Sequence, residues 1–320
     1  MRGWLVLGPV IAAAIACTNP PPPQYAYQEP VVPEERLAPS NPDELGQLDN
    51  RMVDFVFDGG QIEFEMYRNG DRVVQIARSR YAVPMMISWS MTRLDNLDPA
   101  TAASGVAYLP AAPSPLGLGK AIVLAEFRQP DLSRRYSRHL AFRARFGDPR
   151  SVPTPYQYAL PYPHGLTFAV LQGFHGAFSH KGSNEFAVDF DCPVATPVLA
   201  AREGTIVAAN AAAQGSGTTP DYLDYQKTNF VIVMHDDGTL GEYMHLAPSS
   251  VGVKPGDRVE RRQMLALSGN TGFSSTPHLH FQLMTAADDG IGARSFPFEL
   301  AIRPDKVEEP VLGHRYAAWE

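Results

Sequence analysis

Cysteine, positive charge and long apolar runs are all scarce in this 320-residue sequence. It has two cysteines, Cys17 and Cys192, so no disulfide framework forms if either is otherwise engaged. Lys and Arg total 27 against 34 Asp and Glu, which gives a net charge of −7. This acidic balance, with no visible basic stripe, argues against a nucleic-acid partner. The body of the chain also has no apolar run long enough to span a bilayer.

The first 17 residues, MRGWLVLGPVIAAAIAC, differ from the rest. Arg2 gives a positive start, and the apolar run that follows is too short for a membrane span. This is the shape of a secretory signal. The end of the segment, AIAC, resembles a bacterial lipobox, in which the cysteine is acylated. We therefore predict a lipoprotein-type signal peptide over residues 1–17 and a membrane lipid anchor at Cys17; an ordinary cleaved signal is the alternative. Cys192 then has no partner and is predicted to be a buried, inert thiol.

Residues 18–48 form a proline-rich segment, with eight prolines between Thr18 and Gln47. Proline blocks helices and sheet ladders and favours extended structure. We predict a semi-rigid tether that holds a folded body away from a membrane surface.

Short strands dominate residues 49–155. The stretch QIEFEMY alternates apolar and polar residues and predicts a half-buried strand, and RNGD followed by RVVQIA predicts a hairpin. We predict a β-sandwich-like accessory domain here. It contains no cluster of His, Cys or paired carboxylates. We therefore expect this domain to act as a spacer, a docking unit or a steric control, and not to take part in catalysis.

A proline-dense stretch precedes a second domain, predicted over residues 158–300 and followed by a C-terminal tail over residues 301–320. Glycine-punctuated segments such as EFAVDF, NFVIVMHDDGTLGEYMHL and HLHFQLM predict antiparallel hairpins. We therefore predict a mainly β chain, with no sustained helical period.

The second domain contains a set of residues suited to binding metal. His278 and His280 are two apart in a strand-like segment, so their side chains share one face. His245 ends another predicted strand, while His180 precedes the strand that carries Asp189. Zinc binds imidazole and carboxylate groups, and a catalytic zinc has three protein ligands and one open position. Paired strand histidines are more often structural, and spacing alone leaves open which of these residues bind metal.

Three segments resemble the lysostaphin-type (LytM-type) zinc endopeptidases of bacterial cell walls. They are EYMHL, VKPGDRVERRQMLALSGNTGFSSTPHLHF and AVDFDCPVATPVLAAREGTIVAA, and the resemblance as a whole runs from roughly Phe174 to Leu283. The resemblance implies an antiparallel β peptidase domain with one zinc ion. It also implies that Asp189 and His280 bind the zinc, and that His245 and His278 line the reaction site without binding it.

The third zinc ligand departs from the family pattern. The family shows His-x-x-x-Asp, but Glu185 stands four residues before Asp189 in this chain. His180 is nine residues before Asp189, an odd offset that would aim it to the opposite face of an unbroken strand. Residues 182–184 are turn formers, so the strand is interrupted there and the odd offset no longer fixes the direction of His180. Imidazole is also the better zinc ligand, so we predict His180, with Glu185 as the alternative.

The remaining histidines are predicted to be structural. They are His139, His164, His235 and His314. His175 is close enough in sequence to His180 to be a candidate for supporting the site without binding the metal.

The resemblance implies a zinc-dependent endopeptidase that hydrolyses peptide bonds in peptidoglycan cross-links or stem peptides. One of His245 and His278 would take a proton from water, and the other would hydrogen-bond the developing oxyanion. The altered ligand motif keeps open a metal-free LytM-like regulator, or a wall-binding module, that activates other wall hydrolases. A wall-binding lipoprotein with chance histidines fits the ordered match poorly.

The predicted location is the bacterial cell envelope, secreted, lipid-anchored and facing the periplasm. Thr18, where an aspartate would mark the inner membrane, points to an outer membrane. The sequence does not identify the bond cut, a wall-hydrolase or divisome partner, or an oligomeric state.

Overall fold

The computed structural model describes residues 29–114 and 117–319. The predicted signal peptide, Cys17 and the first part of the predicted tether lie outside these residues. Across the described residues, no helix combines the length and the hydropathy needed to cross a membrane. The later part of the predicted tether contacts the folded body: Leu37 bridges Ile122, and Leu45 is buried.

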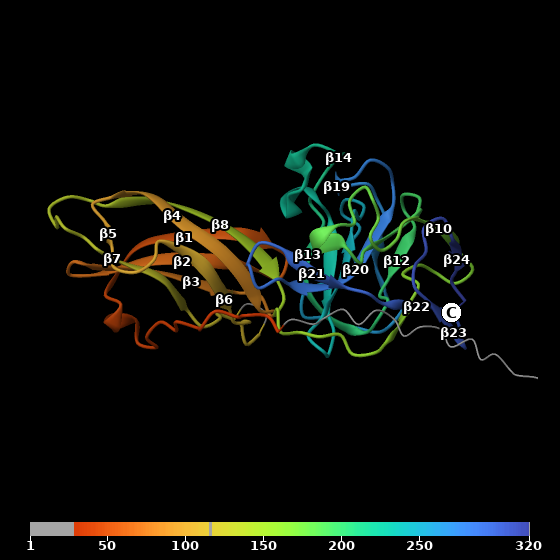
Figure 1. The fold of residues 1–320 in the computed structure, drawn as a ribbon, viewed down its shortest axis with the longest axis horizontal. Coiled ribbons are helices and arrows are strands. Elements are labelled where there is room, and N and C mark those ends of the chain that lie inside the picture. The colour runs from red at the N-terminus through yellow and green to blue at the C-terminus, as the bar shows by residue number, and fades with distance from the viewer. Residues whose placement is uncertain (1–28, 115–116, 320) are drawn as a thin grey trace, which may run out of the picture.

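The N-terminal half contains two antiparallel sheets (Figure 1). A short 3-10 helix, η1 (Pro42–Glu44), leads into them. The first sheet has the order β1 (Gln47–Phe57), β2 (Gly60–Asn69), β3 (Arg72–Ser79), β7 (Ile122–Arg128) and β5 (Asp98–Pro99). The second has the order β6 (Ser104–Leu109), β4 (Met85–Asp95) and β8 (Ser137–Phe146).

The predicted hairpin is present as β2 and β3, which pair up to Asn69 and Arg72 around a turn that contains Gly70. The expectation that β2 is half-buried was wrong, because both of its faces are covered. Its apolar residues enter the core. Its polar face is buried as well, because arginines from the neighbouring strands cover Glu63 and Glu65 and pair with them.

The C-terminal half is built on a nine-stranded antiparallel sheet. Its order is β17 (Arg258–Val259), β13 (Gly204–Asn210), β15 (Phe230–Met234), β16 (Leu240–Met244), β20 (Leu279–Ala286), β11 (Val188–Phe190), β10 (Thr167–Gln172) and β24 (Arg315–Ala317), with β21 (Ala293–Phe296) also paired to β20. The strands β16 and β11 each pair two neighbours and β20 pairs three, so these central strands have a defined register.

Smaller elements complete this half. The small sheets are β9 (Gln157–Ala159) with β22 (Glu299–Arg303) and β23 (Lys306–Glu308), β12 (Pro197–Leu199) with β18 (Met264–Leu267), and β14 (Ser216–Gly217) with β19 (Gly272–Phe273). Three 3-10 turns are η2 (Gly182–Asn184), η3 (Pro220–Tyr222) and η4 (Tyr225–Lys227). The segment predicted as a C-terminal tail is folded, because Tyr316 on β24 is buried against the sheet.

One hydrophobic cluster joins the two halves, and a second lies wholly in the C-terminal half. Side chains of the N-terminal sheets, such as Phe64 and Phe146, belong to the same buried cluster as Phe230 and Met284 of the nine-stranded sheet. The two halves lie side by side, with β8 pointing toward the C-terminal half (Figure 1). The prediction of a mainly β chain is confirmed. The sandwich class of residues 49–155 and the domain boundaries stay predictions.

A buried histidine and aspartate cluster

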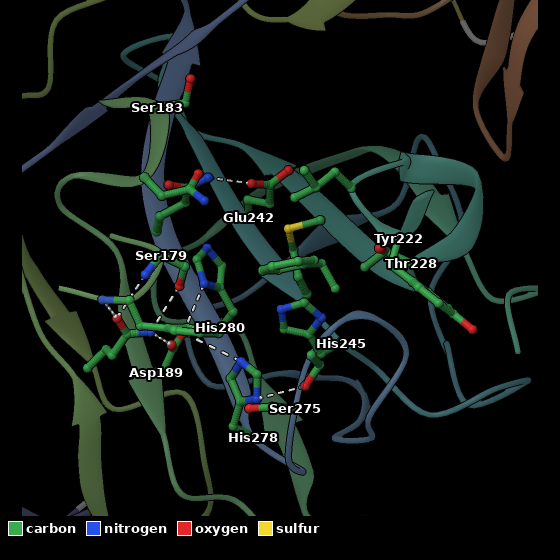
Figure 2. A pocket seen from close by; sticks show the side chains of 18 of the residues that line it. Ser179, Ser183, Asp189, Tyr222, Thr228, Glu242, His245, Ser275, His278 and His280 are labelled. Carbon is green, nitrogen blue, oxygen red and sulfur yellow. Dashed lines mark hydrogen bonds and ion pairs between the residues drawn. The ribbon is translucent and has the colours of Figure 1, made fainter. Parts of the chain in front are cut away.

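Three adjacent strands place the centre of the site. Asp189 on β11 and His280 on β20 are direct partners in the antiparallel register, so their side chains meet on one face of the sheet. Met244 on β16 is the partner of His280 on the other side, and His245 follows it at the strand end. The Nδ1 atom of His280 lies 2.9 Å from Oδ1 of Asp189. Figure 2 shows these side chains pointing into one space.

His180 reaches Asp189 from a loop. Its Nε2 atom lies 3.1 Å from Oδ2 of Asp189, and its side chain is fully buried. The turn expected near residues 182–184 is present as η2, where Gly182 has a φ of +56°. Glu185 instead lies 3.1 Å from His175, and its side chain is 46% exposed. The structure thus brings His180, and not Glu185, to Asp189.

His180, Asp189 and His280 form a cluster suited to a metal ion. One potential ligand atom from each lies within 4.8 Å of the others, and all three residues are buried. Burial alone would raise the pKa of Asp189, but the adjoining imidazoles of His180 and His280 hold that pKa well below its ordinary value. A buried carboxylate that stays ionised between two imidazoles is an arrangement that favours a cation.

The hydrogen bonds of His180 test whether a metal fits. The carbonyl of Gly173 lies 2.9 Å from Nδ1 and can only accept, so Nδ1 carries a proton. In the neutral ring Nε2 therefore turns a lone pair toward the Asp189 carboxylate. This Nε2 atom is buried without a hydrogen-bond partner in the described structure, and Nδ1 of His280 faces the same carboxylate. A metal ion would separate the facing lone pairs, so the imidazole, carboxylate and imidazole donors fit zinc.

His245 and His278 lie beside the cluster in similar settings. Backbone carbonyls of Thr271 and Thr276 accept hydrogen bonds from their Nδ1 atoms, at 2.7 and 2.8 Å. Their ring centroids are 4.6 Å apart, and Nε2 of His278 lies 3.7 Å from Asp189. Burial lowers the pKa of both, that of His245 to about 3. Both rings are therefore neutral at pH 7 and can accept a proton at Nε2.

The other histidines lie elsewhere. His235 is buried, with Nδ1 3.1 Å from the hydroxyl of Thr239, and burial lowers its pKa to about 3. His175 contacts Glu185 and the ring of Phe186. Neither residue is within the His180, Asp189 and His280 cluster.

Sequence reasoning missed one polar contact of the cluster. Gln172, at the end of β10, is the strand partner of Asp189, and its amide donates a hydrogen bond of 2.9 Å to Oδ2. The other amide atom accepts from the backbone N–H of Phe178 and Ser179. Gln172 thus ties the loop that carries His180 to the carboxylate. No local sequence pattern could have revealed it, because the contact depends on strand register.

The cluster opens into a cavity of about 540 Å³. Its lining includes Asp189, His245, His278 and His280, and it continues past them to Glu242 (Figure 2). A buried set of imidazole and carboxylate donors, open to a cavity and flanked by neutral histidines, is typical of metal-dependent hydrolases.

Comparison with known proteins agrees with that class. Residues 183–290 match the sequence profile of Peptidase family M23, so the chain carries an M23 peptidase domain. The matched range contains Asp189, His245, His278 and His280, while His180 lies just before it.

Two relatives illustrate the similarity. The chain is 38% identical over 126 residues to the glycyl-glycine endopeptidase ALE-1 of Staphylococcus capitis, covering 39% of this chain and 27% of the relative. It is 33% identical over 127 residues to the peptidoglycan DD-endopeptidase ShyA of Vibrio cholerae, covering 38% and 26%. The chain thus spans about a quarter of the length of these relatives. The catalytic domain of lysostaphin from Staphylococcus simulans is 31% identical, with a TM-score of 0.27, covering 44% of this chain and 85% of that domain.

Proposed function

We propose that the protein is a zinc-dependent endopeptidase that hydrolyses peptide bonds in peptidoglycan cross-links or stem peptides. The observation that carries this proposal is the buried cluster of His180, Asp189 and His280, in which an ionised carboxylate faces two imidazoles. In this proposal these three residues hold one zinc ion, and His245 and His278 act on the substrate.

A zinc ion bound there would polarise the scissile carbonyl and lower the pKa of a water from about 15.7 to about 7. The residues of the chain supply the rest. The neutral Nε2 atoms of His245 and His278 are free to exchange protons, because backbone carbonyls hold the Nδ1 protons. One ring takes the proton of the attacking water at Nε2, and the other donates a hydrogen bond to the oxygen that gains charge once its own Nε2 has taken up a proton.

The relatives support the choice of substrate. ShyA is named as a peptidoglycan DD-endopeptidase and ALE-1 as a glycyl-glycine endopeptidase, and this chain is 33% and 38% identical to them over 127 and 126 residues. We extend to this protein the substrate class of peptidoglycan peptides. We further propose a cell-envelope location, with a lipid anchor at Cys17 and a periplasm-facing body.

The alternative of a metal-free regulator depended on Glu185 replacing an imidazole ligand. His180 lies next to Asp189, so the donor set is complete without Glu185. The alternative thereby loses its main support.

The proposed function is tested by incubating the mature protein with purified peptidoglycan and identifying the products by mass spectrometry. We expect new peptide ends, their loss after treatment with a chelator, and their recovery when zinc is restored. Glycan fragments without new peptide ends, or peptide cleavage that persists after complete metal removal, would contradict the proposal.

A further inference from the structure

The cavity continues beyond the metal cluster along strands β16 and β20. His280 and Gln282 are two residues apart on β20, so they face the same way. Opposite them on β16 stand Met244 and Glu242, and Glu242 is the direct partner of Gln282. Glu242 lies farther along the cavity than His280, with its carboxylate joined to a neighbouring side chain (Figure 2). Both Glu242 and Gln282 are buried and line the cavity.

The N-terminal half contributes an arginine to this end of the cavity. Arg145 on β8 is part of the lining, and its guanidinium lies 5.4 Å from the centre of the Tyr225 ring. Its hydrogen bond goes to the carbonyl of Ala144. Within the described residues, no carboxylate lies at ion-pair distance from Arg145. The groove therefore contains a positive charge whose contacts in the described structure are a backbone carbonyl and an aromatic face.

The neighbouring groups are fixed in place. The hydroxyl of Tyr225 donates a hydrogen bond of 2.6 Å to one oxygen of Glu242, and the amide nitrogen of Gln282 donates to the other. The oxygen Oε1 of Gln282 is buried and, in the described structure, has no hydrogen-bond partner. The lining of this end of the cavity therefore includes an unused acceptor and, within the described residues, a cation without a carboxylate partner, a combination that suits a peptide N–H and a carboxylate of one ligand.

We propose that Arg145 and Gln282 form a subsite that binds a carboxylate-bearing residue of the substrate peptide, with Arg145 setting the preference for that carboxylate. This inference rests on the proposed function for the nature of the substrate. Two residues along a strand span about 7 Å, the length of about two residues of an extended peptide. The subsite thus selects a residue about two positions from the bond that is cut. Glu242 positions Tyr225 and Gln282.

The test is a binding measurement that needs no turnover. Uncross-linked tetrapeptide fragments of peptidoglycan are prepared with free carboxylates and with the same groups converted to carboxamides. Calorimetry measures the affinity of the full chain for both, with and without zinc. We expect the wild type to prefer the carboxylate form, and Arg145→Gln to weaken its binding by about 10- to 100-fold, the range of a charge-assisted hydrogen bond. Binding of the carboxamide form should stay unchanged.

A matched control comes from the same strand. Arg143 lies two residues earlier on β8, is exposed and does not line the cavity. Arg143→Gln should leave both affinities unchanged, and Arg145→Lys should keep part of the preference because it keeps the charge. Equal affinity of the wild type for the two fragments, or equal losses in the Arg143 and Arg145 variants, would overturn the subsite. Absence of wall hydrolysis with an intact carboxylate preference would reject the proposed function and leave the subsite standing.

Discussion

Both halves of the molecule bury carboxylates among β-strands, but they surround them differently. In the N-terminal half Glu63 is 1% exposed, and it is paired with Arg51 and Arg80. In the C-terminal half Asp189 is 4% exposed, and its partners are histidines. Arginine stays charged at every relevant pH, whereas neutral histidine offers a lone pair that can bind a metal.

The two buried carboxylates differ in whether the polar atoms around them are all satisfied. Each contact of Glu63 joins opposite charges or a donor to an acceptor, and Gln61 adds a hydrogen bond of 2.8 Å. At Asp189 the nitrogen Nε2 of His180 lies close to a carboxylate oxygen without a proper hydrogen bond. Burial of a charge was common to both sites, and the unsatisfied nitrogen was particular to the second. We therefore expect substitutions in the two halves to act on different properties.

The largest difference is expected between Asp189→Ala and Glu63→Ala. The first should remove bound zinc and lower wall hydrolysis by about a thousandfold or more, since the pKa of water returns toward about 15.7. The second should leave metal content unchanged and destabilise the fold by about 1–3 kcal/mol, because its arginine partners lose a buried acceptor but keep contact with solvent. Metal analysis and thermal unfolding measure the two effects. Equal metal loss in both variants would show that the two carboxylates do not differ in function.

The same metal analysis tests the choice of the third ligand. His180→Ala should lose zinc, and Glu185→Ala should retain it, because Glu185 contacts His175 on the surface. The reverse result would make Glu185 the ligand.

A smaller effect is expected from His278→Ala, which should retain zinc while hydrolysis falls by about 100- to 10,000-fold, the usual contribution of a proton-transferring side chain. His235→Ala is the matched control, because His235 is also buried with a pKa lowered to about 3 but lies outside the cluster. Turnover per zinc-loaded molecule should not change in that control. Zinc loss in the His278 variant would instead identify His278 as a ligand.

The smallest effect concerns acid stability. Burial would raise the pKa of Glu63, but hydrogen bonds from Arg80, Gln61 and Arg51 outweigh it and leave that pKa lowered. A lowered carboxylate pKa stabilises the fold above the ordinary pKa of about 4.3, and this stabilisation is lost as the pH falls through the folded value. Glu63→Gln should therefore reduce the loss of stability between about pH 5 and pH 3 in urea unfolding. A pH dependence identical to that of the wild type would exclude this contribution.

Several features of the site could be predicted from residue patterns. The alternation around His278 and His280 predicted two side chains pointing to one place, and both line the cavity. The turn formers after His180 predicted a break that returns the loop toward Asp189, which the structure confirms. Turn formation and the alternation of side chains along a strand depend on residues close together in sequence, so both can be predicted from one sequence.

Other features were missed because they depend on long-range packing. The polar face of β2 looked exposed, since nothing near Glu63 in sequence predicts that Arg51 and Arg80 will cover it. No local pattern singles out Arg145, which the packing of the two halves places in the cavity.

The sequence by itself determined the β character of the chain, the turns and the kinds of donor available to a metal, because these depend on residue type and on spacing over a few positions. The tertiary structure decided which donors meet: the register of β11 against β20 joins Asp189 to His280, and the packing of β8 against the C-terminal half brings Arg145 to the same cavity. Such contacts join residues far apart in sequence, 91 positions for Asp189 and His280, and their geometry is set by the packing of whole sheets rather than by any local preference.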